Sequence, residues 1–247
     1  MPDLATAFVV AAAVLLAGFL KGIVGFGFPT TSTTLLALFL DVKVAVVLVI
    51  LPNIVMDGVQ MVRRGRLGPT ARRLAVSLIA GGVGIVLGTK LLVMLPGWVA
   101  TLLLGLFTLA FVALNATPFN PRLAPEWEKP LLPAAGFVSG VLGGLTNTPG
   151  TVLVILFYAL GFPKDEFLRS IAMSFLVLKV VQLGAVAQFG LMSWGLLATS
   201  VGLTVVAVVG FYGGLRVQDR LDQRAFNRAV LAFLALLGFW LIYRSVV

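Results

Sequence analysis

Two stretches rich in glycine, proline and hydroxyl side chains interrupt very apolar sequence, at residues 21–34 and 139–151. Glycine and proline disfavour a continuing helix, so each stretch predicts a break after which a new helix begins. The free N–H groups and the positive dipole end of such a helix favour an anion. The side chains chosen as anion ligands near the two breaks are Thr30, Thr31, Ser32, Thr146, Asn147 and Thr148. Side chains of these types also serve simply as N-caps, and that alternative stays open.

A second set of polar side chains lies inside the apolar runs. Asn53, Asp57 and Gln60 are spaced to share one helical face, and an offset of 122 residues takes Asp57 to Lys179 and Gln60 to Gln182. Charged residues within membrane spans are costly, so they line a pathway or pair with one another. Two interpretations remain: a structural Asp57–Lys179 ion pair, or substrate binding. In the second, Asn53, Lys179 and Gln182 bind the substrate, and Asp57 and Gln60 serve in coupling or gating.

Lys21 stands at the end of the first apolar run, directly before the first break. If residues 4–40 form a hairpin, Lys21 lies at its tip, deep in the protein, where an anion site needs a cation. If this segment is a simple span, Lys21 is an ordinary lysine at the membrane interface. We include Lys21 among the candidate substrate-binding residues.

The composition indicates a protein that crosses a membrane several times. Of the 247 residues, 60% are hydrophobic and 11% are charged, and the mean hydropathy is +1.10. A soluble domain has about 25% charged residues. The net charge of +9 comes from basic residues in short loops, which the positive-inside rule explains better than nucleic-acid binding. We expect a lipid bilayer and a small anionic substrate as partners, and no nucleic acid.

The residues that are missing exclude several kinds of chemistry. The chain has no Cys and no His, which removes disulfides, imidazole and thiolate metal sites and a histidine proton relay. Neither an HExxH nor a GxSxG sequence is present, and Asp57 has no second intramembrane Asp for a protease dyad. We therefore predict a protein that is not an enzyme and uses no metal or cofactor. Small-residue faces such as Gly84/Gly88 could pack within the monomer or between the monomers of a homodimer.

The basic loops fix an expected orientation. Placing residues 63–73 and 216–228 on the cytoplasmic side requires residues 130–160 to enter and leave the membrane on the same side. The predicted fold is therefore an all-α polytopic membrane protein of two inverted-topology repeats, each a broken, re-entrant-like helical hairpin followed by three transmembrane helices. The first repeat, residues 1–116, has its hairpin at 4–40 and spans at 44–62, 74–95 and 99–116. A cytoplasmic linker at 117–129 leads to the second repeat, residues 130–247, with its hairpin at 130–160 and spans at 170–189, 194–215 and 229–247.

The two breaks and the basic loop resemble the TauE/SafE sulfite exporter family over essentially the whole chain. The glycines and prolines that carry the resemblance are Gly22, Gly25, Gly27 and Pro29 in the first copy and Gly140, Gly143, Gly144 and Pro149 in the second, and the segment 62–66 is similar as well. The resemblance implies a carrier in the bacterial inner membrane for small sulfur-containing anions such as sulfite or sulfonated organic acids.

Three classes of function are compared. In a secondary transporter, a site near the membrane midplane alternates between the two faces as one half rocks against the other. In an anion channel, or in a transporter of another small organic anion, the same breaks would form a filter or a site of different selectivity. A structural membrane protein with no transport is disfavoured, because an inert bundle has little reason to bury Asp57, Lys179 and Gln182.

Overall fold

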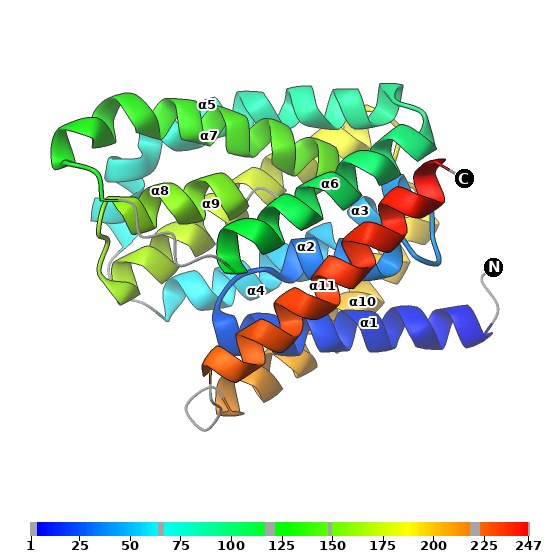
Figure 1. The fold of residues 1–247 in the computed structure, drawn as a ribbon. Coiled ribbons are helices and arrows are strands. Elements are labelled where there is room, and N and C mark those ends of the chain that lie inside the picture. Colours follow the sequence, from blue (N-terminus) through cyan, green and yellow to red (C-terminus); the bar gives the residue numbers. More distant parts are fainter. Residues whose placement is uncertain (1–3, 64–66, 117–121, 148–149, 218–222, 247) are drawn as a thin grey trace.

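The computed structural model describes residues 4–63, 67–116, 122–147, 150–217 and 223–246 (Figure 1). Within these ranges the chain is helical and contains no strand. Six helical stretches in the described part are long and apolar enough to cross a membrane. The protein is therefore an all-α, multi-pass membrane protein, as the sequence predicts. The elements are α1 (Leu4–Val24), α2 (Phe28–Leu36), α3 (Val42–Leu48), α4 (Ile50–Val62), α5 (Leu67–Met94), α6 (Gly97–Ala116), the 3₁₀ turn η1 (Pro125–Trp127), α7 (Glu128–Thr146), α8 (Gly150–Ala159), α9 (Lys164–Gln188), α10 (Trp194–Val217) and α11 (Gln223–Val246).

Both breaks exist, but each begins later than the glycines suggest. Helix α1 continues past Lys21 to Val24, and the chain then turns through Gly25 and Gly27, both at φ +91°. Helix α7 continues through its glycines to Thr146 and ends at Asn147, at φ +62°. Asparagine is one of the few residues other than glycine that adopts this left-handed conformation readily.

The glycines inside α1 and α7 do not break these helices. They instead allow neighbouring helices to pack closely against them. Helix α1 lies along α10, where Gly18 and Gly22 face the carbonyls of Ala207 and Phe211. In return, Gly210 and Gly214 of α10 face carbonyls of α1. A Cβ atom at any of these four glycines would collide with the opposite backbone. We call this contact the α1–α10 seam.

Helices α5 and α7 form a second contact of the same kind, the α5–α7 seam. A Cβ atom at Gly140 would lie 2.8 Å from the backbone nitrogen of Ile85 and would overlap the carbonyl of Gly81. Gly84 and Gly88 face the backbone of α7 in the same way. These small residues are therefore used within the monomer, and a homodimer would have to use other surfaces.

The hydrophobic cores divide most of the helices into two packing units. The first unit contains α1–α4 together with α10, around a core that includes Val14, Phe28, Met56 and Phe211. The second unit contains α7–α9 together with α5, around a core that includes Leu74 and Phe157 (the Phe157 ring also stacks on Phe162). In Figure 1, α5 and α7 lie on one side of the molecule and α1 and α10 on the other, with α2 and α4 between them.

The two packing units do not coincide with the two halves of the sequence. Each unit takes three or four consecutive elements from one half and one long helix, α5 or α10, from the other half. The units meet where α4 packs along α9. Helices α6 and α11 pack on each other and cover a further core that reaches α2 and α3.

The span expected at residues 44–62 has an irregular point at Val49, between α3 and α4. Pro52 has no N–H, so the carbonyl of Leu48 lacks its usual helical donor. Ser200 of α10 donates its hydroxyl to this carbonyl over 2.8 Å. A side chain of a neighbouring helix thus satisfies the backbone group that the proline leaves free, as membrane helices require.

Candidate anion-binding site

The polar face of α4 meets the end of α1 in the interior of the protein. The ammonium of Lys21 donates to Asn53 Oδ1 over 3.0 Å and forms an ion pair with Asp57. Gln60 donates through Nε2 to the carbonyl of Gly25 over 2.7 Å, so that the first break is held against α4. All three side chains of this face are buried. This cluster, in the first unit, contains one positive and one negative charge.

A second cluster lies on the other side of the interface between the units. Lys179 of α9 donates to Asn147 Oδ1 and, over 2.5 Å, to Gln182 Oε1. Gln182 donates in turn to the carbonyl of Gly143 over 3.2 Å. Asn147 also donates through Nδ2 to the hydroxyl of Thr33 over 2.7 Å, which ties the second break to α2 of the first unit.

The structural Asp57–Lys179 ion pair considered from the sequence is wrong. Asp57 pairs with Lys21, because α1 continues through Lys21 and places this side chain against α4. Within the described part of the chain, the hydrogen bonds of the Lys179 ammonium go to the neutral amide oxygens of Asn147 and Gln182. Asp57 and Lys179 nevertheless lie on helices α4 and α9, which pack along each other. Lys179 is thus a buried cation without its own carboxylate.

Several polar atoms in this interior have no hydrogen-bond partner in the described structure. On α4 these are Asn53 Nδ2, Asp57 Oδ2 and Gln60 Oε1, and on α9 the hydroxyl of Ser174 is among them. A buried polar group without a partner costs about 1–3 kcal/mol. The free donor and the two free acceptors on α4, beside Lys21 and the end of α1, therefore indicate a place where a polar ligand or water completes the hydrogen bonding.

The hydroxyl residues near the breaks have less uniform roles than expected. Ser32 donates to the carbonyl of Phe28 over 2.6 Å and Thr146 to that of Leu142 over 2.9 Å, both within their own helices. Thr30 and Thr31 are buried in α2. The prediction for Thr148 falls outside the described residues.

The alternative that these side chains act as N-caps fails where it can be examined. The N-cap of α2 is Gly27, without a side-chain hydrogen bond, and the hydroxyl residues lie further along the helix. Asn147 ends α7 as its C-cap. The N-terminus of α2 therefore remains without a side-chain cap.

Two members of the network were not among the residues chosen from the sequence. Thr33 is the partner of Asn147 across the unit interface, and Ser174 presents an unpartnered hydroxyl. Thr33 lies in the first polar stretch and Ser174 in the same apolar run as Lys179, but the sequence gave no reason to prefer them over their neighbours. Gln60 and Gln182 donate to the backbone carbonyls of Gly25 and Gly143. Every residue has such a carbonyl, so the sequence cannot single these two out.

Apolar contacts flank the two clusters along the α4–α9 interface. Toward the start of α4, Ile50 packs with Val186 of α9 in a small core. Toward the first turns of α9, the rings of Phe26 and Phe167 lie edge to face with centroids 6.3 Å apart. The polar clusters are therefore enclosed between apolar contacts that both cross from one unit to the other.

An ion cluster connects helices α5, α7 and α9 of the second unit. Arg73 of α5 binds both carboxylate oxygens of Glu128 of α7, at 2.5 and 2.7 Å, and a carboxylate oxygen of Glu166 of α9 at 2.5 Å. Its guanidinium also lies 3.9 Å from the ring centre of Phe162. The Arg73 guanidinium lowers the pKa of the Glu128 carboxyl. These contacts all lie inside one packing unit.

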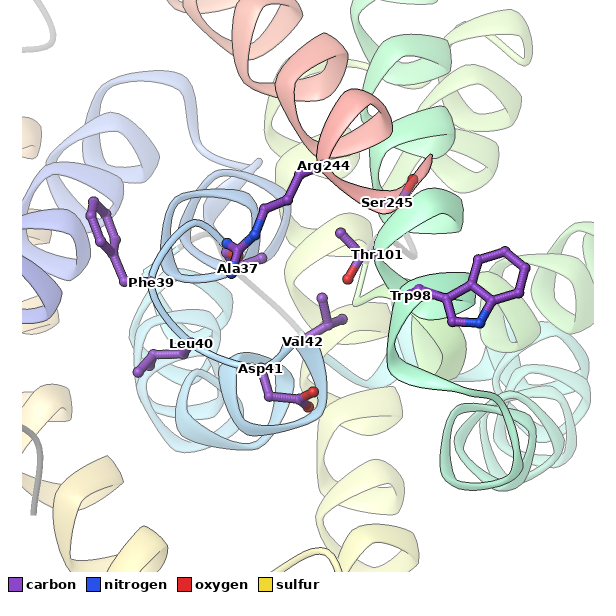
Figure 2. A pocket seen from close by; sticks show the side chains of 9 residues that line it. All are labelled: Ala37, Phe39, Leu40, Asp41, Val42, Trp98, Thr101, Arg244 and Ser245. Carbon is purple, nitrogen blue, oxygen red and sulfur yellow. The ribbon is translucent and has the colours of Figure 1, made fainter. Parts of the chain in front are cut away.

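A surface pocket of about 370 Å³ is separate from the buried clusters. It lies between the end of α2, the start of α3, the start of α6 and the end of α11, and Asp41, Trp98 and Thr101 contribute to its lining. Figure 2 shows Arg244 reaching from α11 toward Ala37, where it donates to the carbonyls of Ala37 and Leu38 at 3.1 and 2.7 Å. None of the candidate site residues lines this pocket.

Comparison with known families agrees with this architecture. The family described as Sulfite exporter TauE/SafE matches residues 10–241. The chain belongs to the TauE/SafE sulfite exporter family. None of the curated proteins and none of the solved structures compared with the chain gives a match. As a TauE/SafE protein with six apolar helices of spanning length among its described residues, it is a multi-pass membrane protein of a transporter family that exports sulfite and related anions.

Proposed function

We propose that this TauE/SafE protein is a secondary transporter that exports small sulfur-containing anions, such as sulfite or sulfonated organic acids, across the bacterial inner membrane. The observation that carries this proposal is Lys179, a fully buried cation bound to the neutral oxygens of Asn147 and Gln182. It is not an enzyme and needs no cofactor. The site residues are those of the two buried clusters, with Lys179 as the anion ligand and Asp57 and Gln60 as coupling or gating residues.

Electrostatics supports an anion at Lys179. An ion taken out of water without a counter-charge costs several kilocalories per mole, because the interior offers a much lower dielectric. The amide oxygens of Asn147 and Gln182 lower this cost without cancelling the charge. A bound anion would supply the missing charge, and Asn53 Nδ2 would supply a further donor.

The same residues suggest where the transport motion takes place. The clusters lie between the two packing units, and the hydrogen bond from Asn147 to Thr33 and the ring contact of Phe26 with Phe167 cross that interface. Within each unit, the helices of a glycine seam pack with their backbones in direct contact. Separating them would lose this close packing. We infer that alternating access is a motion of the first packing unit against the second. Rocking of the two sequence halves would require both seams to open.

The proposed inverted repeats agree with the packing. Helix α1 of the first half pairs with α10 of the second, and α7 of the second half pairs with α5 of the first. Under the offset of 122 residues these two pairs exchange, which is the relation expected of two repeats linked by a pseudo-two-fold axis.

Counterflow in proteoliposomes tests the proposed function. Vesicles holding the purified protein and loaded with unlabelled sulfite should take up labelled sulfite faster than empty vesicles, and the rate should saturate. Linear flux that internal sulfite does not accelerate would favour the channel alternative. If folded protein gives no flux of sulfite or of a sulfonate above that of protein-free vesicles, the proposed function is wrong.

A further inference from the structure

We propose that Asp57 restricts the buried site to anions that carry a single negative charge. The proposal rests on the proposed anion-transport function and specifies its substrate class further. For the sulfite system it selects hydrogen sulfite over the sulfite dianion, and for organic substrates it selects monosulfonates over disulfonates.

The charge balance of the interior is the first step. The ionisable side chains that are buried in the described part of the chain are Lys21, Asp57 and Lys179. Lys21 and Asp57 neutralise each other in their ion pair, which leaves one net positive charge, that of Lys179. One monovalent anion balances this charge. A divalent anion would leave the interior with a net negative charge, which the low dielectric makes costly.

The position of Asp57 is the second step. One carboxylate oxygen is bound to Lys21, whereas Oδ2 is buried without a partner. Asp57 of α4 and Lys179 of α9 lie on two helices that pack along each other, so an anion at Lys179 also feels the negative charge of Asp57. Lys21 would not stabilise the second negative charge of a dianion, because the Lys21 ammonium is already paired with Asp57. Asp57 thus shields one lysine and repels excess negative charge.

For the sulfite system, the unpartnered atoms agree with a singly charged oxyanion that keeps a hydrogen. Asn53 Nδ2 is a donor suited to a sulfonate or sulfite oxygen, whereas Asp57 Oδ2 and Gln60 Oε1 are acceptors. Acceptors cannot bind a bare oxyanion, but they can bind a hydroxyl hydrogen. A fully deprotonated dianion has none to offer, whereas hydrogen sulfite has one.

Binding of two sulfonates to the purified protein tests this proposal. Methanesulfonate and ethane-1,2-disulfonate carry the same head group with one or two charges, and their affinities can be measured by titration calorimetry in detergent. Wild-type protein should bind methanesulfonate at least tenfold more tightly. Asp57→Asn frees Lys21 and removes the repulsion, so it should improve disulfonate binding at least tenfold. The matched variant Glu126→Gln removes an exposed acid and should keep the wild-type preference.

A double variant separates charge from damage to the site. Lys21→Gln with Asp57→Asn again leaves Lys179 as the buried charge, and it should restore the preference for methanesulfonate. Equal or tighter binding of the disulfonate by folded wild-type protein would overturn the proposal for Asp57 while leaving anion binding intact. Folded wild-type protein that binds neither sulfonate would contradict the anion site itself, and with it this proposal. Even if Asp57→Asn fails to fold, the wild-type comparison can still overturn the proposal, and the double variant still tests the role of the buried charges.

Discussion

Asn147 donates through Nδ2 to the hydroxyl of Thr33 over 2.7 Å, and its Oδ1 accepts from Lys179. One amide side chain therefore connects the buried cation of the second unit with α2 of the first unit. Its backbone, at φ +62°, forms the turn that ends α7. An anion that took over the Lys179 ammonium would release Asn147 Oδ1, and so alter a contact between the units. In the proposed transport mechanism, this link would carry anion binding to the interface between the units.

Substitution in the α5–α7 seam should destabilise the protein. In Gly140→Ala the new methyl group would meet the backbone of Gly81 and Ile85, which cannot rotate away as a side chain could. Overpacking of this kind costs about 1–3 kcal/mol. Thermal unfolding in detergent should therefore begin at a clearly lower temperature than in the wild type.

A glycine outside the seams provides the control for this prediction. Gly202 of α10 is exposed, and a Cβ atom there meets no other atom within 4 Å. Gly202→Ala should leave the unfolding temperature unchanged or raise it, because alanine is the better helix former. Equal unfolding temperatures for the two variants would show that the seam tolerates extra volume.

Cross-linking should distinguish contacts between the units from contacts within one unit. The chain has no native Cys, so introduced pairs are the sole reactive thiols. A short thiol cross-linker joining Phe26→Cys to Phe167→Cys ties the two units together. We expect it to stop sulfite counterflow, and cleavage of the link should restore the flux.

The matched pair lies within the second unit. Arg73→Cys with Glu128→Cys replaces an ion pair between α5 and α7, and the same cross-linker should leave most of the counterflow intact. Counterflow that continues after complete cross-linking of positions 26 and 167 would contradict a motion between the units.

The Arg73–Glu128 ion pair should make stability depend on pH in the acid range. Because Arg73 lowers the pKa of Glu128 in the folded protein, the pair stabilises the fold at pH values above the ordinary carboxyl pKa. This contribution is lost as the pH falls below about 4.5 and through the folded-state pKa. The pair is partly exposed, so we expect an effect of at most about 1 kcal/mol.

Thermal unfolding between pH 7 and pH 3 tests whether the ion pair's contribution to stability is lost on acidification. Glu128→Gln should be less stable than the wild type at pH 7, and the difference should shrink on acidification. Glu126→Gln removes an exposed acid two residues earlier and serves as the comparison. A difference that grows as the pH falls would contradict the assigned role of Arg73.

The sequence predicted the fold class and the polar face of α4, because hydropathy and spacing are local signals. It also indicated both breaks, but it misjudged where they begin. Gly22 and Gly144 were taken as helix breakers, although each serves the close approach of a neighbouring helix. A glycine in an apolar run can either break a helix or allow another helix to pack closely. The partner helix that decides between these two roles lies far away in the sequence.

The pairing of charges could not be predicted for the same reason. The offset of 122 residues suggested Asp57 opposite Lys179, but the length of α1 brings Lys21 to Asp57 first. The exchange of α5 and α10 between the packing units is likewise a tertiary feature. The inverted membrane orientation of the two repeats remains a prediction.

The most direct test of the account is whether sulfite stabilises the folded protein through Lys179. A ligand that binds the folded state alone adds about 2.7 kcal/mol of stability at a hundredfold excess over Kd. Thermal unfolding in detergent should shift upward with sulfite in the wild type and in Lys90→Met, which changes an exposed lysine of α5. In folded Lys179→Met the shift should vanish. An equal shift in Lys179→Met, or none in the folded wild type with any small sulfur anion, would contradict the proposed site.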